Sequence, residues 1–245
     1  MTSRIRNTLA AVALAASALA PAASQAAVVR LSSWAYGNSW NNQVKVGTPA
    51  HTGAAGGFKG SVDFDAGEEA QGWVDVADPD FITYCIEITE SFHGFPSALM
   101  AGYEVRSAAA YGWSAARAER IGRLMSHVAA DPTRVDHKDE STALQLALWN
   151  LVYDTDADLS LLAGDFRETG SSTFETYADA LLAASANAAN RYEVHVLSKA
   201  GSQDFLLLRQ VPEPATLALC LAALGGVGLS RRRRRADAGA AAAPR

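Results

Sequence analysis

The chain has 245 residues, of which 49% are hydrophobic and 19% are charged, and its formal net charge is −5 at pH 7. Most of the basic charge lies near the ends: residues 27–230 hold 13 Lys and Arg against 25 Asp and Glu, a net charge of −12. An acidic segment of this length is large enough for one domain with a proper core, but it is a poor candidate for binding nucleic acid.

The N-terminus has the order of a secretory signal peptide. Two arginines within the first six residues precede an apolar run at 9–19, and small residues follow. That apolar run is too short to span a bilayer comfortably, and Ser24-Gln25-Ala26 fits the small-x-small rule before a cut. We therefore expect residues 1–27 to be a signal peptide, with the exported chain starting at Ala27 or Val28.

The first half of the remaining segment, residues 28–210, is predicted to be mostly β-structure. Apolar and polar residues alternate at 58–64, and aromatic and β-branched residues dominate 81–89, which places Cys85 on a strand. Strands are expected at 28–36, 44–46, 58–64, 73–76, 81–89 and 103–105.

The second half is predicted to be helical, with a closing β-hairpin. Helical spacing of apolar residues predicts helices at 114–129, 139–153 and 172–190. Ser114 can cap the first of these, and Asp131-Pro132 ends it. Strands at 192–197 and 204–208 complete the chain, so we expect a single α+β domain.

The C-terminus carries three differently composed elements. Pro212-Glu213-Pro214 precedes an apolar run at 215–229, and arginines fill 231–235. This order resembles the PEP-CTERM sorting signal, which we assign to residues 211–235 with a short transmembrane helix. The tail at 236–245 is of low complexity and is expected to be disordered.

The PEP-CTERM resemblance implies a Gram-negative bacterium that makes exopolysaccharide, and an exosortase that processes the chain near the Pro-Glu-Pro motif. It implies transient anchoring in the inner membrane, with the arginines on the cytoplasmic side. The product is then expected at the cell surface or in the extracellular matrix of a biofilm.

Cysteine usage is unusual for an exported protein. The chain has two cysteines, Cys85 and Cys220, and Cys220 lies in the apolar run of the sorting signal. Exported proteins usually pair their thiols, so a domain with Cys85 alone requires a specific explanation. The thiol could be a reactive group, a buried apolar side chain, or half of a disulfide between two copies.

Two short motifs favour the reactive group. Tyr84-Cys85-Ile86-Glu87 and the helical segment Gln145-Leu146-Ala147-Leu148-Trp149 resemble the two signature motifs of bacterial thioester domains, which mediate adhesion. In that family an aromatic-Cys-apolar-acid strand is followed by a Gln-x-x-apolar-Trp helix. Leu144 departs from the pattern, which has threonine before the glutamine.

The thioester resemblance implies that the sulfur of Cys85 replaces the side-chain nitrogen of Gln145 and releases ammonia. A partner amine or hydroxyl, on a protein or an exopolysaccharide, then opens the thioester and stays attached. Tyr84, Glu87 and Trp149 are expected to shield or support the pair. No turnover, cofactor or metal is expected, so the protein is not predicted to be an enzyme.

Other interpretations stay open. If Cys85 is only a buried thiol and Gln145 a solvated residue, the protein is a non-reactive structural or interaction protein of the matrix. A cysteine hydrolase would pair Cys85 with His127 or His137. The alternating Asp154, Asp156 and Asp158 start like a calcium loop, but Leu159 replaces the turn glycine and Asp165 the closing glutamate, which favours an acidic helix end.

Overall fold

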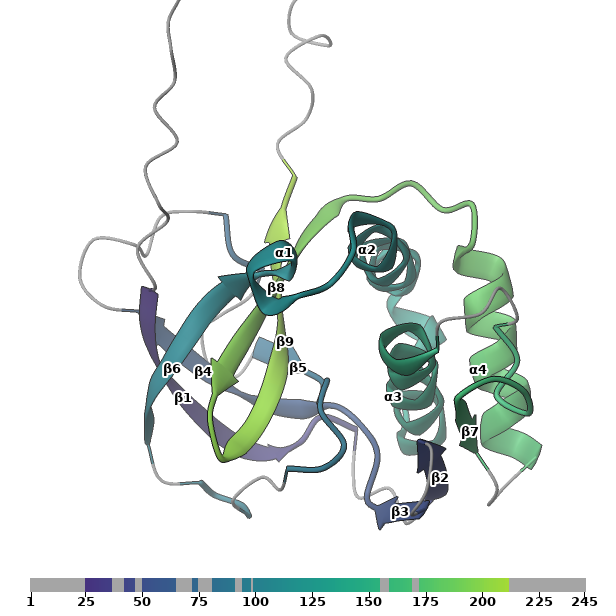
Figure 1. The fold of residues 1–245 in the computed structure, drawn as a ribbon, viewed down its shortest axis with the longest axis horizontal. Helices are drawn as coiled ribbons and strands as arrows, with labels where there is room; N and C mark the ends of the chain where they lie inside the picture. Colours follow the sequence, from purple (N-terminus) through teal and green to yellow (C-terminus); the bar gives the residue numbers. More distant parts are fainter. Residues whose placement is uncertain are drawn as a thin grey trace, which may run out of the picture.

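The computed structural model describes residues 25–36, 42–46, 50–64, 72–74, 81–90, 94–97, 99–154, 159–168 and 172–211. These residues form an α+β domain with strands first, helices in the middle and a closing hairpin, as predicted. A curved antiparallel sheet occupies one side of the domain and the longer helices occupy the other (Figure 1).

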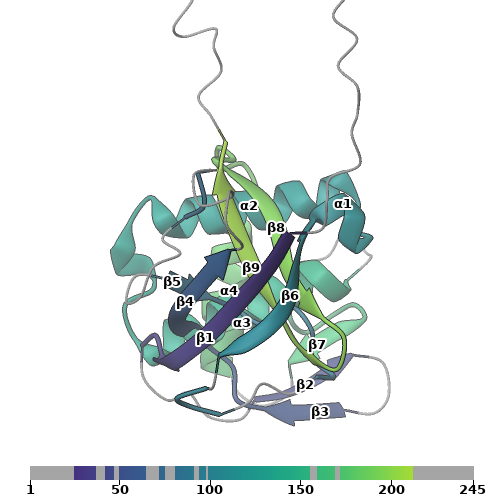
Figure 2. The same ribbon diagram turned by 90° about the vertical axis from the view of Figure 1, so that its left-hand side faces the viewer.

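The large sheet has six strands in the order β5-β4-β1-β6-β8-β9, and every neighbouring pair is antiparallel. Its strands are β1 (Gln25–Trp34), β4 (Phe58–Phe64), β5 (Phe81–Thr83), β6 (Met100–Ser107), β8 (Tyr192–Lys199) and β9 (Ser202–Gln210). Figure 2 shows β1 between β4 and β6, in the middle of the sheet. A small second sheet consists of β3 (Ala50–Gly53), β2 (Asn42–Val46) and β7 (Phe166–Glu168).

The large sheet closes on itself just beyond β5. The main-chain N–H of Leu206 donates to the carbonyl oxygen of Tyr84 at 3.0 Å, and the N–H of Ile86 donates to that of Asp204 at 3.1 Å. These bonds join the two ends of the strand order, since β9 is the last strand. The sheet is therefore a small closed barrel, which leaves no free edge at the segment that carries Cys85.

Aromatic side chains fill the barrel. Phe58 of β4 lies 6.0 Å from Phe205 of β9, and Phe205 lies 5.9 Å from Tyr103 of β6, between ring centroids. The strands approach closely at Gly60, where a Cβ would lie 1.9 Å from the carbonyl oxygen of Arg30. A glycine at this position lets β1 and β4 pair tightly enough to close a narrow barrel.

The helices pack outside the barrel around a central helix that is buried over most of its length. They are α1 (Ala108–Tyr111), α2 (Ala115–Ala129), the 3₁₀ turn Pro132–Arg134, α3 (Lys138–Tyr153) and α4 (Ser172–Ser185). The Ser114 hydroxyl caps α2, as predicted, by accepting from the N–H of Arg117 at 3.2 Å. All twelve residues at 141–152 of α3 are buried, between the barrel and α4 (Figure 1).

Several predicted boundaries are wrong. The strand predicted at 81–89 is regular only at Phe81–Thr83, and residues 87–90 form a turn instead. The register explains this, because Thr83 pairs with Phe58, the first residue of β4, so β4 offers no further partner. The helix predicted at 172–190 ends at Ser185. Strands β3 and β7 and helix α1 were not predicted.

The two ends of the described chain bear on the sorting predictions. Strand β1 begins at Gln25, and Gln25 and Ala26 pair with β6, so the strand starts before the predicted cut. The Pro212-Glu213-Pro214 motif and the apolar run at 215–229 lie outside the described residues. Within the described residues, no helix has the length and apolar character needed to cross a membrane.

Candidate functional site

The structure brings Cys85 and Gln145 into direct contact, although 60 residues separate them in the sequence. The main-chain N–H of Cys85 donates to Gln145 Oε1 at 2.9 Å. In return, Gln145 Nε2 donates to the carbonyl oxygen of Cys85 at 2.6 Å. Both halves of the Gln145 amide are therefore held by the backbone of one residue.

Strand geometry explains why the backbone of Cys85 is free to bind this amide. Cys85 forms an isolated antiparallel bridge with Phe205, in which its neighbours Tyr84 and Ile86 make the hydrogen bonds to β9. In such a pair the N–H and C=O of the central residue point away from the partner strand. Because β4 has already ended, Gln145 takes the place of the missing strand and satisfies both groups.

The pair is deeply enclosed. Cys85 is 6% exposed and Gln145 is 1% exposed. Gln145 is therefore not a solvent-facing residue of an amphipathic helix, and that expectation is wrong. Cys85 is a free cysteine whose burial leaves its sulfur little access to a second copy of the chain, which disfavours an intermolecular disulfide.

The arrangement holds the side-chain amide of Gln145 against the backbone of the residue that carries the thiol. The amide carbon of Gln145 lies between Oε1 and Nε2, which contact the N–H and C=O on either side of the Cys85 α-carbon. If the sulfur attacks this carbon, negative charge develops on Oε1, to which the Cys85 N–H already donates. In such an attack the Cys85 N–H would stabilise the developing oxyanion.

The thiol itself is held in its neutral form. Burial raises the pKa of Cys85 well above its ordinary value, and the nearby carboxylate of Glu87 raises it further. Thiolate formation is therefore unfavourable before attack. A reaction at this site must move the thiol proton while the sulfur–carbon bond forms.

The three residues that were expected to shield or support the pair differ in their contacts. Tyr84 is 2% exposed, and burial raises the pKa of its hydroxyl, while a hydrogen bond with Ser141 lowers it. The carboxylate of Glu87 accepts from the N–H and hydroxyl of Thr89 and from the N–H of Glu90. Trp149 is buried, its ring lies 6.4 Å from that of Phe166, and its Nε1 has no hydrogen-bond partner among the described residues.

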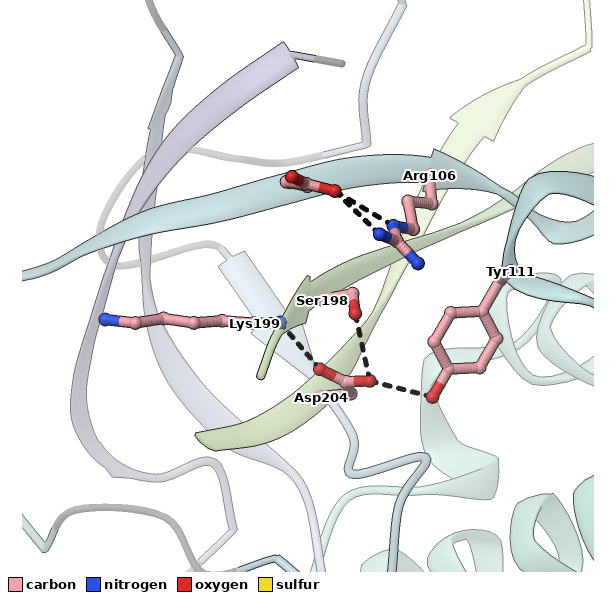
Figure 3. Close-up of polar contacts among 6 residues, drawn as sticks. Arg106, Tyr111, Ser198, Lys199 and Asp204 are labelled. Carbon is pink, nitrogen blue, oxygen red and sulfur yellow. Dashed lines mark hydrogen bonds and ion pairs between the residues drawn. The ribbon is translucent and has the colours of Figure 1, made fainter. Parts of the chain in front are cut away.

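A buried carboxylate beside the Cys85 strand was missed by sequence reasoning. Asp204, 7% exposed, accepts from the Tyr111 hydroxyl at 2.8 Å, the Ser198 hydroxyl at 3.2 Å and the N–H of Lys199 at 2.9 Å (Figure 3). It ties α1 to the end of the β8–β9 hairpin, one residue before Phe205. Asp204 is the first residue of the apolar strand predicted at 204–208, and this position in the sequence could have drawn attention to it.

Neither His127 nor His137 has a contact with Cys85 among the described residues. His127 lines an open groove of about 230 Å³ together with Arg134 and Tyr177, on the helical side of the domain. His137 caps the start of α3 and is exposed. Neither histidine is among the groups that shift the pKa of Cys85. The geometry of the described residues therefore gives no support to a cysteine hydrolase.

The acidic helix end has a structural function. Asp154 is 2% exposed, and its carboxylate accepts from the N–H of Phe166 and from Asn150 Nδ2, each at 2.7 Å. It fastens the end of α3 to β7, while Asp156 and Asp158 lie outside the described residues.

One potential metal-ligand cluster occurs among the described residues. Asp136, His137 and Glu140 bring ligand atoms within 4.8 Å of one another, and two of the three residues are exposed. Glu140 accepts from the N–H of Asp136 at 2.9 Å. This pattern is that of a helix start with acidic residues in its first turn.

Comparison with known proteins gives a match at the C-terminus alone. The PEP-CTERM protein-sorting motif matches residues 210–235. No curated protein and no solved structure matches the chain. The motif indicates export and sorting to the cell surface by an exosortase, while the function of residues 28–210 must be argued from their own geometry.

Proposed function

We propose that this exported protein attaches covalently to a partner through an internal thioester between Cys85 Sγ and the side-chain carbonyl carbon of Gln145. The observation that supports the proposal is the pair of reciprocal hydrogen bonds between Gln145 and the Cys85 backbone. They hold the amide against the backbone of the residue that carries the thiol, and both residues are buried, as the shielding of a stored acyl group requires.

The thioester forms by exchange of the amide nitrogen for sulfur. The thiol attacks the amide carbon, and the oxygen of the tetrahedral intermediate stays on the N–H of Cys85. The carbon–nitrogen bond then breaks, and the nitrogen leaves with the thiol proton. One thiol and one amide give one thioester and one ammonia, so atoms and charge balance.

Loss of ammonia creates the binding position for the nucleophile. Nε2 of Gln145 donates to the carbonyl oxygen of Cys85 at 2.6 Å, and this carbonyl loses its donor when the nitrogen leaves. An incoming amine or hydroxyl that occupies the same position can donate to that oxygen while it attacks the carbon. The products are an amide or ester on Gln145 and the free thiol of Cys85.

The reaction with the partner breaks the thioester and does not restore it. Each protein molecule therefore reacts once, and the protein does not act as an enzyme. The partner is a surface amine or hydroxyl, carried by a protein or by exopolysaccharide. The sorting motif delivers the reactive domain to the cell surface after transient anchoring through residues 215–229. The protein then acts in adhesion or in the assembly of the extracellular matrix.

The deciding experiment is the intact mass of the secreted protein, purified without reducing agents or amines. We expect a mass lower by one ammonia than the sequence requires. Either Cys85→Ala or Gln145→Ala should abolish this loss, whereas Gln210→Ala, which alters an exposed glutamine at the end of β9, should keep it. Methylamine should add once to the wild type and release a titratable thiol.

A second function rests on the same contact. The Gln145 amide is fully hydrogen-bonded by Cys85, so it can act as a fixed link between α3 and the barrel without any reaction. The protein would then be a sorted structural or interaction protein of the matrix. The full expected mass together with one titratable thiol would support this alternative and refute the thioester.

A further inference from the structure

A partner cannot reach the Cys85–Gln145 pair unless part of the domain moves. Helix α3, which carries Gln145, is buried over residues 141–152, and β9 is buried over residues 202–207. Moving either would expose a large apolar surface to water. The described segment that adjoins Cys85 and is itself partly exposed is the turn at 87–90, which follows Cys85 by two residues.

The Glu87–Glu90 turn is built as a small rigid unit. The carboxylate of Glu87 accepts from three donors within the turn, the N–H and hydroxyl of Thr89 and the N–H of Glu90. These bonds close the turn on itself, and the Glu87 carboxylate also interacts with the Tyr153 hydroxyl of α3. The turn can therefore shift as a unit without losing its internal structure.

Three described hydrogen bonds fasten the backbone and the Glu90 carboxylate of this unit to its surroundings, and the side chain of Ile88 packs against the hydrophobic core. Gln203 Nε2 of β9 donates to the carbonyl oxygen of Glu87 at 2.6 Å, and the N–H of Ile88 donates to the Tyr153 hydroxyl of α3 at 3.0 Å. The N–H of Gly201, in the β8–β9 turn, donates to Glu90 Oε1 at 3.1 Å. Three separate elements thus hold the turn, each through a hydrogen bond.

The surfaces to which the turn is fastened are themselves fixed. Asp204 ties the β8–β9 end to Tyr111 of α1 through the bonds drawn in Figure 3. Tyr153 lies in the last turn of the buried helix α3, and burial raises the pKa of its hydroxyl to about 12, so it stays neutral at neutral pH. The turn is then the mobile side of the contact.

We propose that the Glu87–Glu90 turn is the cover of the Cys85–Gln145 pair, and that breaking its three outer hydrogen bonds admits the partner's nucleophile. The part that concerns the nucleophile rests on the proposed thioester, whereas the cover itself does not. Opening exposes the side of the strand next to Cys85 and leaves the Gln145 hydrogen bonds in place. The hydrogen bonds of the turn therefore set the reaction rate but not the formation of the thioester.

The test weakens one outer bond at a time in the full secreted protein. Tyr153→Phe removes the acceptor for Ile88, and Glu90→Ala removes the acceptor for Gly201. Each should speed methylamine incorporation about two- to tenfold, the effect of one hydrogen bond on an opening equilibrium. The loss of ammonia before treatment should remain complete in both variants.

Matched controls alter the same residue types away from the turn. Tyr177→Phe changes an exposed tyrosine of α4, and Glu119→Ala changes an exposed carboxylate of α2. Both should react with methylamine at the wild-type rate. If Tyr153→Phe and Glu90→Ala also react at the wild-type rate with the thioester fully formed, the cover does not control access and the proposal is overturned.

A second readout separates the cover from the thioester. If the wild type shows its full mass, the thioester is refuted, and Cys85 is then a thiol that iodoacetamide can alkylate. The same two variants should be alkylated about two- to tenfold faster than the wild type. Unchanged alkylation in that case would overturn the cover as well.

Discussion

Opening the thioester with methylamine should lower the free energy of unfolding by about 4 kcal/mol. The bond would join residues 60 apart, so it closes a loop of that length in the unfolded chain. The chain-entropy model assigns such a loop about 4 kcal/mol at 25 °C, through restriction of the unfolded state. Methylamine breaks this one bond and leaves every other side chain unchanged.

Urea denaturation can measure the change, because five tryptophans report unfolding by fluorescence. With a slope of about 2 kcal/mol per molar urea, the midpoint should fall by about 2 M. The control is Cys85→Ala treated in the same way. It cannot form the bond, so its midpoint should not respond to methylamine.

Two results would contradict this expectation at different steps. If methylamine does not add to the protein, no thioester is present and the stability argument does not apply. If mass spectrometry shows one methylamine added while the urea midpoint stays within about 0.3 M of the untreated value, the link exists but does not restrict the unfolded chain. That result would refute the loop-entropy estimate and leave the chemistry standing.

Three further predictions concern stability. In a Cys85→Ala background, Gln145→Leu should lower the free energy of unfolding in urea by about 2–5 kcal/mol, because the buried backbone N–H and C=O of residue 85 lose their partner. A decrease under about 1 kcal/mol would contradict the link between α3 and the barrel. Asp154→Ala should cost about 2–4 kcal/mol, since the N–H of Phe166 loses its acceptor, and a wild-type melting temperature would refute this. Burial lowers the pKa of His195, so below about pH 6.5 the unfolded state binds more protons than the folded state. The free energy of unfolding should therefore decrease as the pH is lowered below about 6.5, and His195→Leu should make this pH dependence less steep.

Local elements could be predicted because their signals are local. Ser114 accepts a hydrogen bond within its own helix, and Asp131-Pro132 stops that helix within one turn. The alternation of apolar and polar residues at 58–64 indicates a strand with one buried face, whatever elements cover that face. These features give the fold class without any knowledge of how the elements pack.

Long-range pairing could not be predicted in this way. The barrel closes through Leu206 and Tyr84, which lie far apart in the chain. The predicted strand at 81–89 fails at its end because β4 starts at Phe58. The preceding N–H, that of Gly57, donates instead to the Ser141 hydroxyl of α3 at 2.8 Å. Composition alone cannot show where a partner strand ends.

The candidate site shows the same division. Proximity of Cys85 and Gln145 was expected from the motif resemblance and not from their spacing, because nothing in a separation of 60 residues brings a strand and a helix together. The outer contacts of the Glu87–Glu90 turn were not foreseen. They depend on Gln203, Tyr153 and Gly201, whose types are common and whose positions have meaning only after the barrel has closed.

The polar residues of α3 fasten this helix to the rest of the domain, and Gln145 shares this role. Among the buried side chains of this helix, Ser141 accepts from the N–H of Gly57 and Thr142 donates to the carbonyl oxygen of Ala55 at 2.9 Å. Gln145 is the next fastening point along the helix, and its bonds to Cys85 serve this purpose whether or not a reaction follows. Its burial and its hydrogen bonds are therefore explained equally well by both proposed functions. The sulfur is different, because a non-reactive link needs only the backbone of Cys85, and alanine would serve there as well. Only the thioester requires a thiol at this position, so the mass and reactivity of Cys85, and not the geometry of Gln145, must separate the two functions.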